Sequence, residues 1–261
     1  CPARYPYRHL GRYSQQKPII VHMIELRNIT LGYDAAHVLL RDVSAHFTSG
    51  TTTALIGRNG TGKSTLLRAI IGSERLLQGQ ILIHGNDIQV ITPQQLAQQV
   101  AFVTTERIRI ANLACRDVVA LGRAPYTNWI GRMQEEDEAI VMQSLEQVGM
   151  ADYAFRTMDK MSDGECQRVM IARALAQQTP IILLDEPTSF LDMPNRYELC
   201  HLLADLAHQA NKCIIFSTHE LDIAQSICDT IALIDTPQMH HLPSDEMTSS
   251  GHIDKLFTIR K

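Results

Sequence analysis

A short segment in the first quarter of the chain constrains the fold most. Residues 57–65 read Gly-Arg-Asn-Gly-Thr-Gly-Lys-Ser-Thr, which matches the pattern of a glycine, four residues and then Gly-Lys-Ser or Gly-Lys-Thr. Such a loop wraps a triphosphate with backbone N–H groups, and its glycines allow tight turns and close approach. An apolar segment at 53–56 precedes the loop and an apolar-periodic segment follows it. The pattern therefore predicts a strand, a phosphate-binding loop and a helix whose N-terminus adds positive charge at the anion site.

Two side chains of this loop have predicted chemical roles. We expect Lys63 to reach the β- and γ-phosphates and the Ser64 hydroxyl to ligate Mg²⁺. A glycine-rich turn that matches by chance is the alternative, and the flanking strand and helix disfavour it. The other predicted nucleotide contacts in the loop are Gly57, Asn59, Gly60, Gly62 and Thr65.

A pair of acids follows a second apolar segment. Residues 181–184 are Ile-Ile-Leu-Leu, which predicts a strand buried on both faces of a parallel sheet. Asp185 and Glu186 come next, at the strand end where ligands bind in open α/β sheets. We expect Asp185 to hold Mg²⁺, directly or through water, and Glu186 to act as the general base toward the attacking water. Acids in this position usually belong to a solvated turn, but the phosphate loop upstream reverses that expectation.

A third motif, at residues 161–168, predicts a capped helix. Ser162 can cap it, and Glu165 three residues later completes a capping box. Apolar residues recur from Val169 onward and predict a buried helix that runs toward the strand at 181–184. A capped helix N-terminus is an anion site, yet the loop at 57–65 needs no second one. We therefore expect this site to serve a nucleotide bound by another copy of the chain.

In this order the three motifs resemble those of the ATP-binding-cassette (ABC) ATPases, and the resemblance runs from Met23 nearly to the C-terminus. Residues 161–167 are similar to the family signature loop, Leu-Ser-Gly-Gly-Gln/Glu, which implies nucleotide contacts from Ser162, Gly164 and Glu165. The resemblance implies further roles for three residues outside these motifs: Tyr33 stacking on adenine, Asp192 in a loop that touches the partner copy, and His219 as a switch histidine in catalysis together with Lys63 and Glu186.

The chain departs from the family pattern at two places. A glutamine that usually follows the strand at 100–103 is replaced by Thr105, with Glu106 next to it. We expect Thr105 to lie nearer the metal than Glu106 and Glu106 to turn toward the membrane subunit. Asp163 stands where glycine is usual. Because a carboxylate repels phosphate, we expect Asp163 to face solvent or a cation.

The resemblance implies an α/β fold, namely a P-loop NTPase of ABC type. It has a mainly parallel core sheet flanked by helices, an antiparallel β lobe and a helical subdomain inserted at about 107–160. At 261 residues the chain is long for one compact domain, so two lobes are expected. The pattern also predicts individual elements: β structure over 24–56 and 80–85, a short helix starting at Thr92-Pro93, a helix over 135–148 ended by Gly149, a loop over 185–195, a helix from about 196 to 208, and a strand over 230–234.

Composition excludes some classes of function. The net charge of −4 disfavours a nucleic-acid binder that relies on bulk electrostatics. The six cysteines show no metal-type CxxC spacing, so we expect buried reduced thiols, with Cys213 in a core strand and Cys200 and Cys228 in helices. No apolar run approaches the roughly twenty residues that span a bilayer, so membrane function has to come from separate subunits.

Residues 1–22 are basic, rich in tyrosine and free of acids. A membrane-surface or nucleic-acid arm is one interpretation. We favour a disordered extension or a start-site artefact, with the native domain over 23–261. We do not expect Cys1 to carry a lipid, because a lipid anchor there would place the chain outside the cell, away from ATP.

The predicted helical insert contains the segments 117–126 and 129–132, which resemble the insert of importers for ferric siderophores, haem and cobalamin. Helix packing is the plainer interpretation of most of these residues. Trp129 is the only tryptophan of the chain, and we expect it to be a docking anchor for a membrane subunit.

These observations predict an ATP-hydrolysing subunit of an ABC importer that binds ATP and Mg²⁺ between two copies of itself. The resemblance implies a homodimer at the cytoplasmic face of the cell membrane, two permease subunits and, indirectly, a substrate-binding protein. The main alternative is an ABC ATPase of DNA repair or translation, which usually has two cassettes or a long coiled-coil insert. A P-loop phosphotransferase is a third option, but it would need neither the segment at Met161 nor His219.

Overall fold

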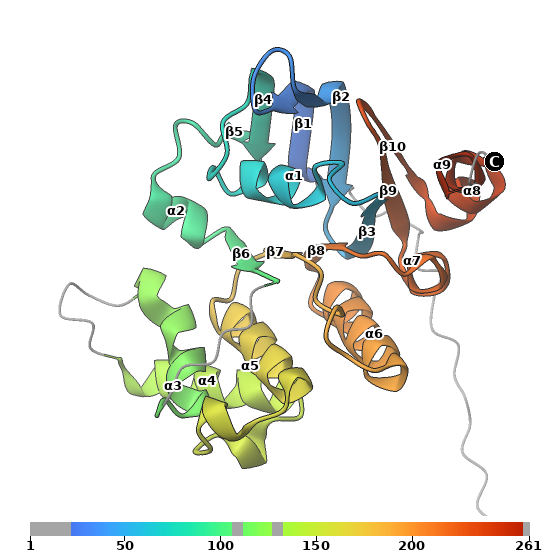
Figure 1. Cartoon of the computed structure of the whole chain (residues 1–261). Coiled ribbons are helices and arrows are strands. Elements are labelled where there is room, and N and C mark those ends of the chain that lie inside the picture. The colour runs from blue at the N-terminus through green and yellow to red at the C-terminus, as the bar shows by residue number, and fades with distance from the viewer. Residues whose placement is uncertain (1–21, 106–111, 127–132, 258–261) are drawn as a thin grey trace, which may run out of the picture.

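The computed structural model describes residues 22–105, 112–126 and 133–257. Figure 1 shows two sheets and helix α1 (Lys63–Ile70) in the upper part of the molecule and a group of helices below them. Within the described residues, no helix is both long and apolar enough to cross a bilayer. Residues 1–21 of the predicted N-terminal extension lie outside the described residues. β1 begins at His22, which pairs with Thr48, one residue before the predicted start of the domain.

The smaller sheet is antiparallel, as predicted for the β lobe, with the order β2-β1-β4-β5. Its strands are β1 (His22–Gly32), β2 (Val38–Thr48), β4 (Gln78–Ile83) and β5 (Asn86–Asp87). In β2, Val43, Ala45 and Phe47 are buried while the residues between them are exposed. Alternation of this kind arises because successive side chains of a strand point to opposite faces, so one face of the lobe packs on the core.

The larger sheet has the order β10-β9-β3-β8-β7-β6. Its strands are β3 (Thr51–Gly57), β6 (Val100–Val103), β7 (Ile181–Leu184), β8 (Cys213–Ser217), β9 (Thr230–Asp235) and β10 (Gln238–Pro243). All neighbours pair in parallel except β9 and β10. Every residue of β7 is buried. Leu183 packs in the core on the side of the antiparallel lobe, whereas Ile182 packs in the core on the helical side. The predicted α/β fold of ABC type is confirmed.

Three helices form a bundle below the sheet: α3 (Cys115–Ala120), α4 (Glu135–Gln147) and α5 (Asp163–Ala176). Short 3₁₀ turns at Leu121–Tyr126, Ala151–Tyr153 and Met158–Lys160 connect them. Arg123 is buried between these elements. Its guanidinium donates to the Asp137 carboxylate at 2.8 Å and to the Ala176 carbonyl at 2.8 Å. Because α5 packs on both α3 and α4, the helical bundle reaches past residue 160.

Local sequence signals place several helix ends. α2 (Pro93–Ala97) begins after Thr92, which forms a capping box with Gln95, as expected for Thr-Pro. α4 ends before Gly149, whose φ of 71° favours glycine. α6 (Met193–Gln209) starts earlier than the predicted residue 196, because the Asp192 side chain accepts the Asn195 N–H and caps the helix. The remaining helices are α7 (Leu221–Ile227), α8 (Ser244–Ser249) and α9 (His252–Phe257).

The cysteines of the described residues are buried, and none of them forms a disulfide there. Burial raises the pKa of the Cys200 and Cys213 thiols to about 12, which keeps them protonated. Cys213 lies in β8 and Cys200 in α6, as predicted. The prediction for Cys228 is wrong: it follows α7 in extended conformation, because that helix ends at Ile227.

Candidate nucleotide site

The phosphate loop connects the end of β3 to the start of α1. Gly62 is the N-cap of α1 with a φ of 101°, a conformation that favours glycine. A Cβ atom on Gly57 would lie 2.8 Å from the Thr61 hydroxyl and 2.9 Å from the Ile234 carbonyl, so a side chain there would collide with the loop and with β9. The glycines of the sequence motif are thus required by the shape of the loop itself.

Lys63 lies inside this loop. Its ammonium group donates to the Gly57 carbonyl at 2.9 Å and to the Arg58 carbonyl at 3.2 Å. Burial lowers the pKa of Lys63, and the negative charges of Glu186 and Asp185 oppose that effect. The ammonium is therefore a positive charge that donates only to neutral carbonyls among the contacts of the described residues, and anionic phosphate oxygens can replace these carbonyls as hydrogen-bond acceptors.

The Asp185 carboxylate joins three segments of the chain. One of its oxygens, Oδ1, accepts hydrogen bonds from the Ser64 hydroxyl at 2.9 Å and from the Ser217 hydroxyl at 2.8 Å. Asp185 is 4% exposed, so its carboxylate receives hydrogen bonds from these two hydroxyls in place of solvent water. The fold thus brings together Ser64 and Asp185, two of the three residues, with Thr105, that the sequence predicts at the metal site.

Glu186 has an unusual backbone conformation. Its φ is 46°, in the left-handed region that a glutamate rarely adopts, and its N–H donates to the Ser217 hydroxyl at 2.8 Å. Backbone strain of this kind is typical of functional sites. The Glu186 carboxylate lies 2.7 Å from Nε2 of His219, so the predicted base and the predicted switch histidine are in direct contact. Both side chains are partly exposed, so solvent reaches the pair.

Ser217 is a residue of the site to which the sequence analysis assigned no role. It is completely buried at the end of β8, where it donates to Asp185 and accepts from the Glu186 amide. The available signal was a lone polar residue closing the apolar run Cys-Ile-Ile-Phe. That signal acquires meaning only once β8 is known to pair with β7.

Thr105 follows β6, the strand beside β7. Its hydroxyl donates to the backbone carbonyl of Asp185 at 2.9 Å. Thr105 therefore lies next to the predicted metal ligand, while its role toward the metal stays a prediction. Glu106, whose orientation was also predicted, lies outside the described residues.

Tyr33 and Asp192 have different surroundings. Tyr33 follows β1 and is 78% exposed, so its ring is open to a stacking partner. The Asp192 carboxylate accepts the Asn195 amide N–H at 3.2 Å and thereby caps α6. The nucleotide and partner contacts predicted for these two residues stay predictions.

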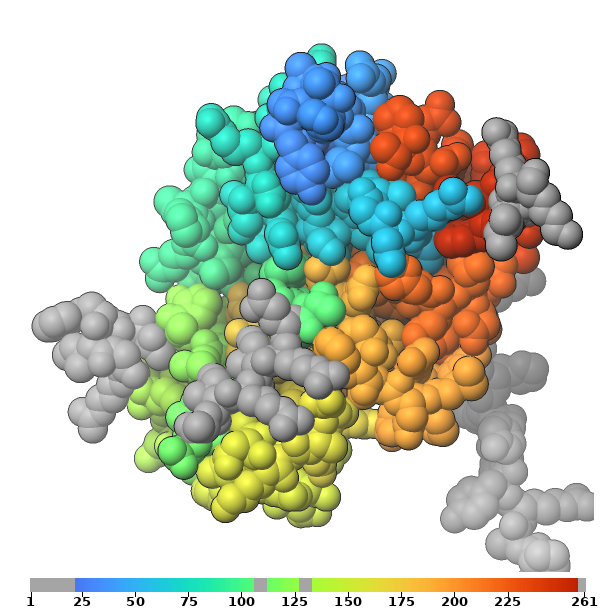
Figure 2. Space-filling view, in the orientation of Figure 1, coloured from blue at the N-terminus to red at the C-terminus, as the bar shows by residue number. Residues whose placement is uncertain are grey.

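The signature segment is remote from the phosphate loop. Ser162 caps α5, and its hydroxyl accepts the Glu165 amide N–H at 3.3 Å, as the predicted capping box requires. Figure 1 places α5 in the lower helical part and α1 in the upper part. Figure 2 shows the same separation between the cyan surface of the phosphate-loop region and the yellow surface of the helical bundle. The fold gathers Lys63, Asp185, Glu186 and His219 at one place and leaves Ser162, Gly164 and Glu165 at another.

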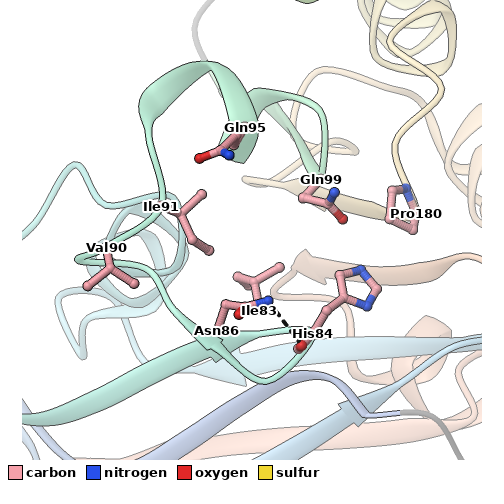
Figure 3. Close-up of a pocket in the computed structure, with 8 residues that line it drawn as sticks. All are labelled: Ile83, His84, Asn86, Val90, Ile91, Gln95, Gln99 and Pro180. Atoms are coloured by element: carbon pink, nitrogen blue, oxygen red, sulfur yellow. Dashed lines mark hydrogen bonds between the residues drawn. The ribbon is translucent and has the colours of Figure 1, made fainter.

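A hollow of about 560 Å³ lies elsewhere, beside α2 and the turn after β4 (Figure 3). Gln99 and Pro180 line it, and they directly precede β6 and β7. In that turn the Asn86 side-chain amide donates to the His84 carbonyl at 3.3 Å. Because the strands run in parallel, this hollow lies at the edge of the sheet opposite to the phosphate loop. It is separate from the nucleotide site.

Comparison with known proteins agrees with this geometry. The family model for the ABC transporter matches residues 40–189. The chain is 39% identical over 212 residues to an uncharacterised ABC transporter ATP-binding protein of Methanocaldococcus jannaschii, covering 81% of this chain and 73% of that protein. It is 37% identical over 211 residues to the achromobactin transport ATP-binding protein CbrD of Dickeya dadantii, covering 81% of this chain and 78% of that protein.

Solved structures share the fold. A structure described as a metal-chelate type ABC transporter in an inward-facing conformation has a TM-score of 0.80 and 28% identity, over 90% of this chain and 89% of that one. A dimeric ATP-binding cassette bound to ADP and Pi has a TM-score of 0.73 over 85% of this chain and 99% of that one, and at 24% identity it supports the fold alone. Fold and site define a P-loop ATPase. The chain belongs to the ABC transporter family, as an ATP-binding subunit that hydrolyses ATP for transport.

The central position of Ser217 leads to the first prediction. Ser217→Ala should lower the free energy of unfolding by about 1–3 kcal/mol, since it leaves the Glu186 amide without its partner. It should also reduce ATP turnover roughly ten- to hundredfold, because Asp185 and Glu186 lose their common anchor. Urea unfolding and phosphate release measure the two effects. Ser226→Ala, which removes an exposed hydroxyl bonded only within α7, is the matched control. Unchanged turnover in Ser217→Ala would refute the positioning role.

Proposed function

We propose that this chain is the nucleotide-binding subunit of an importer for metal chelates, with iron–siderophore complexes, haem and cobalamin as the candidate cargoes. Three relatives support this class by their names: CbrD for achromobactin transport, FpuD of Bacillus anthracis for petrobactin import, and FhuC of Bacillus subtilis for iron(3+)-hydroxamate import. The structure described as a metal-chelate type transporter points the same way. The nucleotide site carries the ATPase function, and the cargo class is inferred from these relatives.

The proposed working unit is a homodimer that closes on ATP. The observation that carries it is the separation, within one copy, of α5, which Ser162 caps, from α1, which begins at Lys63 (Figure 1). A second copy facing the first would bring its Ser162 and Gly164 to the nucleotide held by Lys63 and Ser64. In this arrangement each ATP is buried between two chains, so binding energy drives closure of the dimer and hydrolysis releases it.

Each residue of the site has a proposed role. Lys63 binds the phosphates, Glu186 takes a proton from the attacking water, and His219 orients Glu186 through their 2.7 Å contact. The Ser64 hydroxyl and the Asp185 carboxylate fit Mg²⁺, which prefers oxygen ligands, and they already lie 2.9 Å apart. When bound, the ion would neutralise charge on the phosphates. Tyr33 would stack on the adenine with its exposed ring.

The proposed partners are permease subunits at the cytoplasmic face of the cell membrane, served indirectly by a substrate-binding protein. The resemblance assigns this contact to the helical insert. Within its described part, Val118 and Val119 of α3 are buried, so they pack the core, whereas Leu121 is 54% exposed and available to a partner. Trp129, the predicted anchor, lies outside the described residues. The alternative of an ABC ATPase in DNA repair or translation has no feature in the described part of the chain to support it.

The role of Glu186 gives the second prediction. Glu186→Gln should keep the affinity for ATP but reduce turnover about 10²- to 10⁴-fold, because the amide cannot accept the proton of the attacking water. An ATP-bound dimer should then accumulate and be visible by light scattering. Glu138→Gln, which changes an exposed acid on α4, should keep turnover within about twofold of the parent. Near-normal hydrolysis by Glu186→Gln would remove the residue from the base role.

The cargo class gives the third prediction. Cells lacking the gene should grow poorly when iron is supplied only as a siderophore complex or as haem, or should lose uptake of cobalamin. A plasmid copy of the gene should restore the lost uptake, while a Lys63→Ala copy should not. Normal use of all three nutrients together with a defect in sugar, amino acid or lipid transport would overturn the proposed cargo class and leave the ATPase function standing.

A further inference from the structure

We propose that Arg156 is a positioning residue for the signature segment, defined here as Ser162–Glu165. Its guanidinium offsets the charge of Glu165, so that Ser162 can receive the triphosphate held by a second copy. The inference rests on the shared site proposed above and adds a residue to it.

The signature segment presents an electrostatic problem. Residues 159–165 carry three carboxylates, on Asp159, Asp163 and Glu165, and one lysine, Lys160. A triphosphate that approaches Ser162 meets the Glu165 carboxylate, which is hydrogen-bonded to Ser162 itself. Like charges a few ångströms apart repel each other appreciably even near a protein surface. A cation close to Ser162 would therefore favour closure of the dimer on ATP.

The hydrogen bonds of Ser162 show which carboxylate matters most. Both its amide N–H and its hydroxyl donate to the same oxygen of Glu165, Oε2, at 2.7 and 2.9 Å. A phosphate that accepts a hydrogen bond from Ser162 has to take one of these donors from Glu165. The Glu165 carboxylate thus lies directly beside the position that the phosphate would occupy.

The repulsion is not relieved by protonation of Glu165. The amide of Ser162 lowers the pKa of the Glu165 carboxyl, and the Ser162 hydroxyl and the charge of Arg156 lower it further, against the effect of burial. Glu165 consequently keeps its negative charge at neutral pH. Its charge has to be offset by a neighbour.

Arg156 is placed to supply that offset. Its Nη1 lies 4.0 Å from Oε1 of Glu165, the oxygen that Ser162 leaves free. Its Nη2 donates to the Lys160 carbonyl at 2.7 Å, and its guanidinium lies over the Tyr153 ring, 5.5 Å from the centroid. The Arg156 carbonyl accepts from the backbone amide of Cys115 at 3.0 Å, which ties the residue to the start of α3. Arg156 is held from several sides and directed at the signature segment.

The fourth prediction uses this charge pair. In the Glu186→Gln protein, Arg156→Ala should raise the ATP concentration for half-maximal dimerisation by roughly threefold to tenfold, a modest effect because the Arg156 side chain is 45% exposed. In a chain that also carries Glu165→Gln, the same Arg156→Ala change should raise this ATP concentration less than about twofold, since the charge of Glu165 is no longer there to offset. Glutamine preserves the capping box, so the helix start is kept. Light scattering at increasing ATP concentration measures all four proteins.

Two further variants separate charge from structure. Arg116→Ala is the matched control, because Arg116 also belongs to the helical bundle, pairs with Glu138 at 3.7 Å and lies over the ring of Phe155. It should leave ATP-dependent dimerisation unchanged. Arg156→Lys should weaken ATP-dependent dimerisation less than Arg156→Ala does, because lysine retains the positive charge. The Arg156→Ala effect should also shrink at high salt, which screens exposed charges.

The outcomes distinguish the two proposals. If Arg156→Ala weakens ATP-dependent dimerisation equally with and without Glu165→Gln, Arg156 only stabilises the bundle. If it weakens dimerisation in neither background, Arg156 has no role in the site. Both results would overturn this inference while the shared site stands. If the Glu186→Gln parent itself fails to dimerise with ATP, the shared site is wrong and the role of Arg156 falls with it.

Discussion

The nucleotide site depends on one buried carboxylate. Asp185 receives the hydroxyls of Ser64, at the start of α1, and of Ser217, at the end of β8. Through these bonds the strand end at β7 fixes the phosphate loop on one side and the next strand on the other. Ser217 also accepts a hydrogen bond from the Glu186 N–H, so the position of Glu186 depends on the same contacts. The relative positions of the phosphate loop, the proposed metal ligands and the proposed base thus follow from hydrogen bonds at the ends of parallel strands.

The same architecture underlies the proposal that two copies share one site. The parallel sheet packs one face against the antiparallel lobe and α1, and the other against the helices. The phosphate loop lies at the end of β3, while the signature segment begins α5 in the helical bundle. In the proposed shared site, a nucleotide bound at Lys63 is covered on one side by its own copy. Closure by a second copy would supply the other side, and the charge on Glu165 would make that closure sensitive to its surroundings.

Much of this could be predicted from sequence because the relevant signals are local. The glycines of the phosphate loop, the capping box of Ser162 and Glu165, and the apolar run of β7 each depend on a few adjacent residues. The features that sequence reasoning missed depend on contacts between distant segments. Ser217 acquires its contacts with Asp185 and Glu186 only when β8 pairs with β7, and Arg156 acquires its proposed role only when its guanidinium reaches the Lys160 carbonyl and Glu165 in the folded chain. The early start of α6 was missed because Asp192 was interpreted as a partner contact and not as a helix cap.

The central claim is that Lys63 and Ser162 of different copies bind the same ATP. It is tested most directly by light scattering on two inactive variants, Lys63→Ala and Ser162→Arg, each carrying Glu186→Gln, alone and mixed. Each variant alone spoils both sites of its homodimer, so neither should associate with ATP. The mixture contains dimers with one intact site and should associate. A mixture as monomeric as its two components would contradict the shared site, and so would undiminished ATP-dependent association of the Ser162→Arg variant alone.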